Sequence, residues 1–547
     1  MKNWRFLERK PFFLSAEQIQ WVADTLAGMT DREKAGQLFC LHGTGLSDEE
    51  LADMIENWGV GGVLFRPGPA EKVKEQYARA QSMAKIPLLA AANLEEGGAG
   101  VLTDGTYFGS CMQVAAADDL SCTREFAEVC ALEGRSVGVN WTFSPVVDID
   151  MNYMNPITNV RTFGSDKDKV LANAVEFVST IQKYGVAAAC KHFPGDGVDY
   201  RDQHLHPTYN TLSAEDWYAT YGDIYKTLID CGLMSIMAGH IVQPNVIRDV
   251  NPQATDADML PGSQSKEMIT GVLREKYGFN GVVITDATIM GGYTMSQPRR
   301  DAIPASIAAG CDMLCFGTDV REDITYILEA LENGRLSRER LDEAVTRILA
   351  LKACLAREYP LPGVSAAEAA ARCAGKAVTL VKNTGDALPV TTAKYRGIRL
   401  VTLGDDATFD GSMTQIAAEL LTEKGFEVEY YEPLADDLHG TAALPADRLT
   451  LMLCNMPTAS NQTTVRIKWC SKHALDAPRF VSEERIIFVS FANPYHLQDV
   501  PRVKTYINAY TATRATITAV VDRITGDAPF EGVSPVDPFC GLPDARL

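Results

Sequence analysis

The sequence has no stretch of about 18 consecutive apolar residues, the length that a membrane-spanning helix needs. It also lacks the apolar core of a signal peptide, because residues 1–10 carry several charges and the apolar run at 11–14 is too short. We therefore expect a cytoplasmic protein that makes no contact with membranes.

Basic residues are scarce, since 51 Lys and Arg stand against 71 Asp and Glu and leave a net charge of -20. Without a basic surface a protein cannot release counterions from a phosphate backbone, so nucleic acid is not an expected partner. The 13 cysteines include no Cys-x-x-Cys pair and predict free thiols. The glycine-rich pieces at 59–62 and 97–100 lack the spacing of dinucleotide-binding or phosphate-binding loops, so we expect no cofactor.

What the first 350 residues do contain is a repeated alternation of short apolar runs with helical patterns. Short, almost continuously apolar runs are typical of parallel strands buried on both faces. Eight such units predict a (β/α)8 barrel with insertions, although periodicity leaves a doubly wound open sheet as the alternative. The eight predicted strands are 37–43, 60–65, 87–94, 139–147, 187–195, 233–241, 281–287 and 311–317.

A second α/β domain is expected after the barrel. A helical pattern at 337–352 closes the barrel, which we place at residues 1–355. Residues 356–375 then form a proline-containing linker that leads into a helix, and residues 376–547 form a smaller α/β sandwich domain. Its predicted strands are 398–403, 428–431, 449–455, 485–491 and 505–510, with helices at 413–424 and 515–524.

Polar side chains stand where the predicted barrel strands end, which is where barrel enzymes carry their reactive groups. Lys191 and His192 lie at the fifth strand, His240 ends the sixth, and Asp286 ends the seventh. A charged residue that closes an apolar strand is costly unless it is paired, so such positions are enriched in function. For His192 alone, a satisfied buried histidine is the more common interpretation.

Asp286 is the sharpest single candidate, although an aspartate that caps the following helix is an equally common explanation. The run 290–293, from Met290 through two glycines, allows close backbone approach and favours a site there. In the loop after the fifth strand, Asp202 can orient the imidazole of His204 and hold its proton. Taken alone, this pair is better explained by solvated loop residues.

Several motifs together resemble glycoside hydrolase family 3, in particular its branch of bacterial β-N-acetylglucosaminidases. They span roughly residues 30 to 390 in the family's order, and their combination is highly specific. The matching segments are 161–166 (RTFGSD), 191–195 (KHFPG), 202–204 (DQH), 279–286 (FNGVVITD), 309–314 (AGCDML) and 378–383 (VTLVKN).

This resemblance implies a role for each matching residue. Asp286 takes the place of the nucleophile, and the Asp202–His204 dyad that of the acid/base. Lys191, His192 and Arg161 match the family's sugar-binding residues. In the loop after the third strand, however, Leu94 stands where the family has a sugar-binding aspartate. Either Asn93 or Glu95 takes over that contact, or the far edge of the sugar is recognised differently; we count both residues with Met290 among the expected substrate-binding residues.

The expected activity is retaining exo-cleavage that releases terminal β-linked N-acetylglucosamine through a covalent glycosyl-enzyme on Asp286. A histidine becomes neutral when it gives up its proton, so it does not repel inorganic phosphate as a second-step acceptor. Three alternatives stay open: a β-glucosidase of the same family, a metal-dependent barrel hydrolase, and a catalytically silent sugar-binding protein. The metal alternative would use His192, His204, His206, His240 and Asp286, but these residues lack the spacing of known metal motifs, and we predict no metal site.

Overall fold

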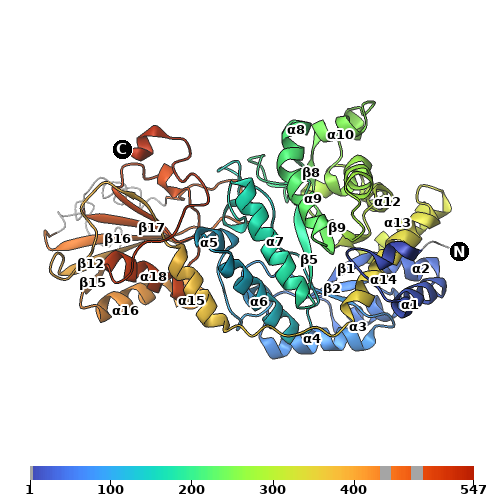
Figure 1. Cartoon of the computed structure of the whole chain (residues 1–547), viewed down its shortest axis with the longest axis horizontal. Coiled ribbons are helices and arrows are strands. Elements are labelled where there is room, and N and C mark those ends of the chain that lie inside the picture. The colour runs from blue at the N-terminus through green and yellow to red at the C-terminus, as the bar shows by residue number, and fades with distance from the viewer. Residues whose placement is uncertain (1–3, 432–444, 470–484) are drawn as a thin grey trace. The chain divides into compact units, whose positions relative to one another are not determined.

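A computed structural model describes residues 4–431, 445–469 and 485–547 (Figure 1). The chain divides into two compact units. Unit 1 comprises Met1–Thr106, Arg124–Asn152 and Val170–Val364, and unit 2 comprises Tyr107–Thr123, Tyr153–Lys169 and Ser365–Leu547. Two segments from the N-terminal half thus belong to unit 2, a feature that the expected linear boundaries at 355 and 375 do not describe.

Unit 1 is built on a closed barrel of eight parallel strands that follow one another around the barrel in chain order. Each strand falls inside one of the eight predicted runs. Closure comes from β10, which pairs with β1, so the predicted barrel is confirmed and the open-sheet alternative is wrong. The strands are β1 (Phe39–His42), β2 (Gly62–Leu64), β3 (Leu89–Ala92), β4 (Trp141–Thr142), β5 (Ala187–Phe193), β7 (Ser235–Ala238), β9 (Val282–Ala287) and β10 (Met313–Cys315).

Helices surround these strands and explain the almost continuous apolar runs, because each strand is buried on both faces. All seven residues of β5 are buried. A short parallel pair, β6 (Thr208–Tyr209) and β8 (Ile241–Val242), lies outside the barrel sheet. The longer helices are α1 (Ala16–Ala27), α4 (Ala70–Met83), α6 (Leu120–Ser136), α7 (Lys167–Lys183), α9 (Asp223–Asp230), α12 (Arg299–Ala309), α13 (Val320–Glu332) and α14 (Arg338–Leu355).

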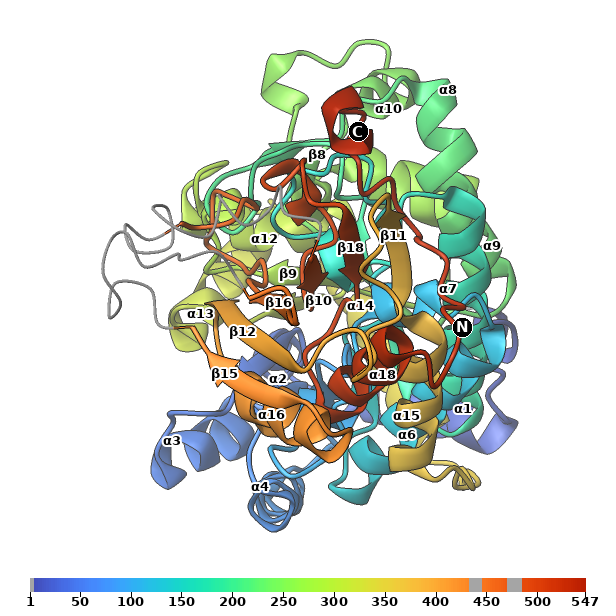
Figure 2. The ribbon, with the colours of Figure 1, turned by 90° about the vertical axis from the view of Figure 1, so that its left-hand side faces the viewer.

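Unit 2 holds a six-stranded sheet in the order β11-β18-β17-β16-β12-β15, parallel except for β11. Along β12, Ile398 and Leu400 belong to one apolar cluster while Val401 and Leu403 belong to another, so both faces of the sheet are buried. Helices α15 (Ala366–Ala377), α16 (Met413–Glu423) and α18 (Arg514–Thr525) pack beside one another along it (Figures 1 and 2). The strands are β11 (Thr379–Asn383), β12 (Gly397–Gly404), β15 (Glu427–Tyr430), β16 (Arg448–Asn455), β17 (Ile486–Ser490) and β18 (Thr505–Asn508).

Two expectations from composition can be compared with this fold. Across the described ranges, no helix combines the length and the apolar character needed to cross a membrane. The cysteines within these ranges are free thiols, and most of them are buried. Because a small apolar thiol packs like other core side chains, burial alone accounts for most of them.

Candidate active site

Asp286 lies near the carboxyl end of β9, where its side chain is 15% exposed. Its Oδ1 accepts a hydrogen bond of 2.7 Å from the Ala287 amide. Burial by itself raises the pKa of this carboxyl, but the charges of three histidines outweigh burial and hold the pKa at about 2. In order of decreasing effect, these histidines are His192, His240 and His204. Asp286 is therefore an anion near neutral pH, as a nucleophile requires.

His192 reaches Asp286 from β5, with 3.8 Å between its Nε2 and Asp286 Oδ2. Its other ring nitrogen, Nδ1, donates a 2.6 Å hydrogen bond to Oδ2 of the fully buried Asp148. Oδ1 of Asp148 accepts two backbone hydrogen bonds, from the amides of His192 (3.1 Å) and Asp196 (2.8 Å). Asp148 thus fixes both the orientation of the ring and the nitrogen that faces Asp286.

Lys191 brings together the loop after β3 and the strand β5. Its ammonium forms an ion pair with Glu95 and lies 3.5 Å from Oδ1 of Asn93. Leu94, between them, is completely buried, and its backbone is bound to Thr142 and Ser144 of the neighbouring strand segment. The side chain at position 94 therefore points into the core, while both predicted replacements for the missing aspartate meet Lys191.

Asp202 and His204, the predicted acid/base pair, are hydrogen-bonded to each other. His204 Nδ1 donates a 2.7 Å hydrogen bond to Asp202 Oδ1, which also accepts from the His204 amide at 2.8 Å. The Asp202 carboxylate is fully buried, whereas the His204 side chain is 23% exposed. This arrangement leaves Nε2 of His204 as the ring nitrogen available to a substrate.

Two glycines after β9 connect the Asp202–His204 loop to the strand that carries Asp286. The Gly291 amide donates to the His204 carbonyl at 2.8 Å, and the Gly292 amide donates to the Gln203 carbonyl at 3.1 Å. A Cβ atom at Gly291 would lie 2.2 Å from the Leu205 carbonyl oxygen, so no side chain fits there. The close approach predicted for this run occurs, and the partner is the backbone of the loop that carries His204.

His240 follows β7 and is completely buried. Its Nε2 donates to the Ala287 carbonyl at 3.0 Å, so this nitrogen carries a proton, and its Nδ1 lies 2.9 Å from the Ser263 hydroxyl. Burial lowers the pKa of His240 to about 4, against a smaller opposing effect of Asp286. His240 is therefore a neutral ring near neutral pH, and it holds the residue that follows Asp286.

Two further residues, Arg161 and Met290, are predicted to bind substrate. Arg161 ends the short helix η4 (Asn159–Arg161) in unit 2, where its guanidinium donates to the Ile157 carbonyl at 3.4 Å. Met290 is only 6% exposed, whereas its neighbour Ile289 is 57% exposed. Substrate contact by Arg161 and Met290 stays a prediction.

Sequence reasoning missed Asp148 and gave Asp196 no role. Asp148 directly follows the predicted strand 139–147, so the strand-end rule that selected Asp286 would have found it. Asp196 is 2% exposed, and its Oδ2 accepts a 3.0 Å hydrogen bond from the side-chain Nε2 of Gln203. The backbone carbonyl of Gln203 in turn accepts a hydrogen bond from the Gly292 amide. Asp196 therefore links the loop after β5 to the loop that holds the dyad.

Nowhere in the described residues do three His, Cys, Asp or Glu side chains gather in a way that could hold a metal ion. The ring nitrogens of two candidate ligands are instead occupied by protein groups. Nδ1 of His192 binds Asp148, and both ring nitrogens of His240 bind protein oxygens. The arrangement suits acid/base and nucleophilic chemistry by side chains.

Comparison with known proteins places this site in a family. The model of the glycosyl hydrolase family 3 N-terminal domain matches residues 30–351. A "Beta-N-acetylglucosaminidase/beta-glucosidase" of Cellulomonas fimi is 42% identical over 562 residues, covering 99% of this chain and 100% of that protein. A β-glucoside phosphorylase, BglX, solved with 2FGlc bound, is 43% identical with a TM-score of 0.91, covering 98% of this chain and 100% of the other.

A second similar structure supports the fold alone. It is a family 3 β-N-acetylglucosaminidase from Paenibacillus sp. str. FPU-7, 24% identical with a TM-score of 0.79. The match covers 93% of this chain and 99% of that one, so both the barrel and the second sheet have counterparts there.

Proposed function

The chain belongs to glycosyl hydrolase family 3 and is a glycoside hydrolase, and from this premise we propose a retaining, two-step mechanism with Asp286 as nucleophile and His204 as acid/base. The observation that carries the proposal is geometric: Nε2 of His192 lies 3.8 Å from Oδ2 of Asp286, and the hydrogen-bonded Asp202–His204 pair is tied to the segment after β9 through Gly291 and Gly292. Retaining cleavage needs a carboxylate on one face of the anomeric carbon and a proton donor near the leaving oxygen.

In the first step, an oxygen of Asp286 attacks the anomeric carbon and the glycosidic C–O bond breaks. The electron pair of that bond goes to the leaving oxygen, which takes the proton from Nε2 of His204. Asp202, which accepts the bond from Nδ1 at 2.7 Å, stabilises the imidazolium that donates this proton. The sugar is then held as an ester of Asp286, and His204 is neutral.

In the second step, an acceptor oxygen attacks the anomeric carbon, and the ester bond breaks to return Asp286 to its carboxylate. If the acceptor is water, neutral His204 takes its proton and the free sugar leaves. If the acceptor is inorganic phosphate, which is already anionic, no base is needed and a sugar 1-phosphate leaves. A neutral histidine at this position repels phosphate less than a carboxylate would, which favours phosphate as acceptor.

For the sugar, we propose terminal β-linked N-acetylglucosamine, the first activity in the name of the Cellulomonas fimi relative. A β-linked glucose is the second candidate, favoured by the β-glucoside phosphorylase that is 43% identical over almost the whole chain. The proposed sugar contacts are His192, whose Nε2 lies 3.8 Å from Asp286, and Lys191 with its neighbours Glu95 and Asn93, together with Arg161 and Met290.

A panel of 4-nitrophenyl glycosides, assayed with and without phosphate, tests acceptor and sugar together. We expect millimolar phosphate to yield a sugar 1-phosphate, detected by ³¹P NMR, and to raise turnover where breakdown of the ester is slow. Free sugar alone at saturating phosphate would restrict the enzyme to hydrolysis. A higher kcat/KM for the β-glucoside than for the N-acetylated analogue would decide for the second candidate.

A further inference from the structure

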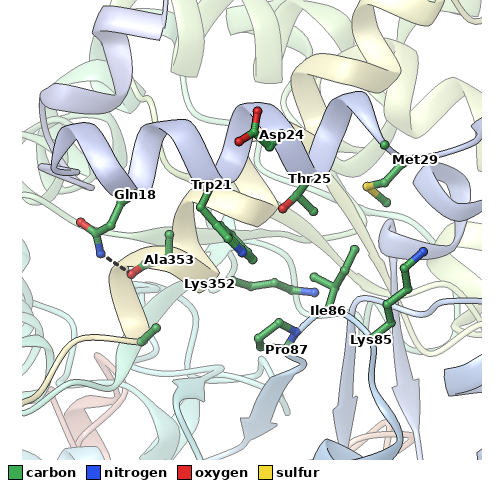
Figure 3. A pocket seen from close by; sticks show the side chains of 12 residues that line it. Gln18, Trp21, Asp24, Thr25, Met29, Lys85, Ile86, Pro87, Lys352 and Ala353 are labelled. Carbon is green, nitrogen blue, oxygen red and sulfur yellow. Dashed lines mark hydrogen bonds between the residues drawn. The ribbon is translucent and has the colours of Figure 1, made fainter.

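A cavity of about 620 Å³ opens between α1, α14 and the segment that precedes β3 (Figure 3). We call it the α1–α14 pocket. It lies at the amino end of β3, because Lys85–Pro87 line it, whereas Asn93 and Glu95 follow the carboxyl end of the same strand. The pocket is therefore separate from the group around Asp286, and the glycosidase mechanism makes no use of it.

The walls of the α1–α14 pocket are mainly apolar. Trp21 from α1, which is 36% exposed, faces Ile86 and Pro87 across the opening, and Met29 and Ala353 add to the lining (Figure 3). Small-molecule sites typically have this size and an apolar lining with few polar groups. An exposed tryptophan over an apolar hollow is suited to a flat or alkyl ligand.

Lys352 lies across the middle of this pocket, between Trp21 and Pro87 (Figure 3). It is 4% exposed, and its ammonium donates a 2.6 Å hydrogen bond to Oε1 of Gln37. Gln37 is held in turn, because its Nε2 donates to the Gly59 carbonyl at 2.7 Å. Within the described parts of the chain, Gln37 is the hydrogen-bond partner of this ammonium and no carboxylate lies within ion-pair distance.

A buried lysine without a counterion is expensive, and an apolar residue of the same length would fill the space without that cost. An ammonium has three N–H donors, and Gln37 accepts one of them. Burial lowers the pKa of Lys352 to about 7, so the amine is only partly charged near neutral pH, and a nearby anion would favour its charged form. The remaining donors are suited to the two oxygens of a carboxylate.

Charged groups at the rim do not supply that anion. The Lys85 ammonium is paired with Glu33 at 3.0 Å, and its side chain is 82% exposed. Asp24 is also exposed and accepts a hydrogen bond from Gln20 at 2.8 Å. Both lie where solvent screens them, so the buried Lys352 dominates recognition inside the pocket.

We propose that the α1–α14 pocket binds a small apolar molecule that carries one carboxylate, with the carboxylate on Lys352 and the apolar body against Trp21. The ligand is an aryl or alkyl carboxylic acid, and the site is distinct from the sugar site. Because Lys352 is partly neutral near pH 7, binding such an anion draws a proton onto the amine.

Isothermal titration calorimetry of the full-length enzyme with 2-naphthoate tests this proposal, with the neutral 2-naphthamide as the matched ligand. We expect Lys352→Met to weaken the binding of 2-naphthoate about tenfold or more, the usual contribution of a charge-assisted hydrogen bond. The affinity for 2-naphthamide should change by no more than about twofold. Lys85→Met is the control for a rim charge and should change neither affinity by more than about twofold. Turnover of a nitrophenyl glycoside verifies that each variant is folded.

A second measurement needs no variant and holds even if Lys352→Met fails to fold. At pH 8, titrations of the natural protein in two buffers with different ionisation enthalpies should reveal uptake of up to about one proton per bound 2-naphthoate and none with 2-naphthamide. Equal affinity for the two ligands without proton uptake, or no binding of 2-naphthoate at millimolar concentration, would overturn the proposal.

Discussion

Replacing Asp148 with asparagine tests how the buried carboxylate behind His192 controls the nucleophile. Oδ1 of Asp148 accepts two backbone amides, so an asparagine must keep its oxygen at that position. Its NH2 group then faces Nδ1 of His192, where Oδ2 of the natural carboxylate accepts a 2.6 Å hydrogen bond from the ring. An NH2 group can only donate, so Nδ1 must become an acceptor and the ring proton must lie on Nε2, the nitrogen that faces Asp286.

Two results follow from this change. His192 contributes the largest of the charges that lower the pKa of Asp286 to about 2, so Asp148→Asn should raise that pKa. Loss of a hydrogen bond to a charged group costs about 1.5–3 kcal/mol, which corresponds to a roughly 10- to 150-fold lower kcat/KM. The acid limb of the kcat/KM profile should also move to higher pH, because Asp286 must be ionised to attack.

The assay is kcat/KM of a 2,4-dinitrophenyl glycoside from pH 3 to 8, since this leaving group needs little help from His204. Asp196→Asn is the matched control, because Asp196 is buried in the same loop region but binds Gln203 and Gly197 instead of the His192 ring. A kcat/KM for Asp148→Asn within about threefold of the natural enzyme, with an unmoved acid limb, would refute the reasoning.

Two further predictions concern histidines. His204→Ala should lower turnover of natural glycosides by roughly 10²–10⁴-fold, while a dinitrophenyl substrate still gives a burst and azide restores its turnover; equal losses for both substrates would move the acid/base role elsewhere. The buried ring of His240 takes up a proton only near pH 4, whereas the unfolded ring does so near 6.5. As pH falls through this window, the free energy of unfolding should therefore drop by roughly 3 kcal/mol from this residue. Urea titrations should detect a smaller drop for His240→Gln, and parallel curves for both proteins would contradict the assignment.

The barrel could be predicted because its strands are buried on both faces, which leaves an apolar run at every strand. The residues at the strand ends were predictable for the same reason, since Lys191, His192 and Asp286 each interrupt such a run. Closure of the barrel was not predictable, because it depends on the pairing of β10 with β1 across about 270 residues of chain.

Roles that depend on distant partners needed the structure. His240 stands at a predicted strand end, yet its function as a support follows only from its bonds to Ser263 and Ala287. Likewise, no local pattern assigns the segment Tyr107–Thr123 to unit 2. Its Ser110 amide donates to the Thr511 hydroxyl at 2.9 Å, about 400 residues further along the chain.

The account depends most on Asp286 as the residue that carries the sugar in the covalent intermediate. Incubating the enzyme with a 2-deoxy-2-fluoroglycosyl fluoride and measuring the intact mass tests this directly. The fluorine at C2 slows both steps, but the fluoride leaving group keeps the first step fast enough for the ester to accumulate. We expect the mass to rise by one fluorosugar, peptide mapping to place the addition on Asp286, and Asp286→Ala to remain unlabelled. An adduct on another residue, or labelling of Asp286→Ala to the same extent, would contradict the mechanism.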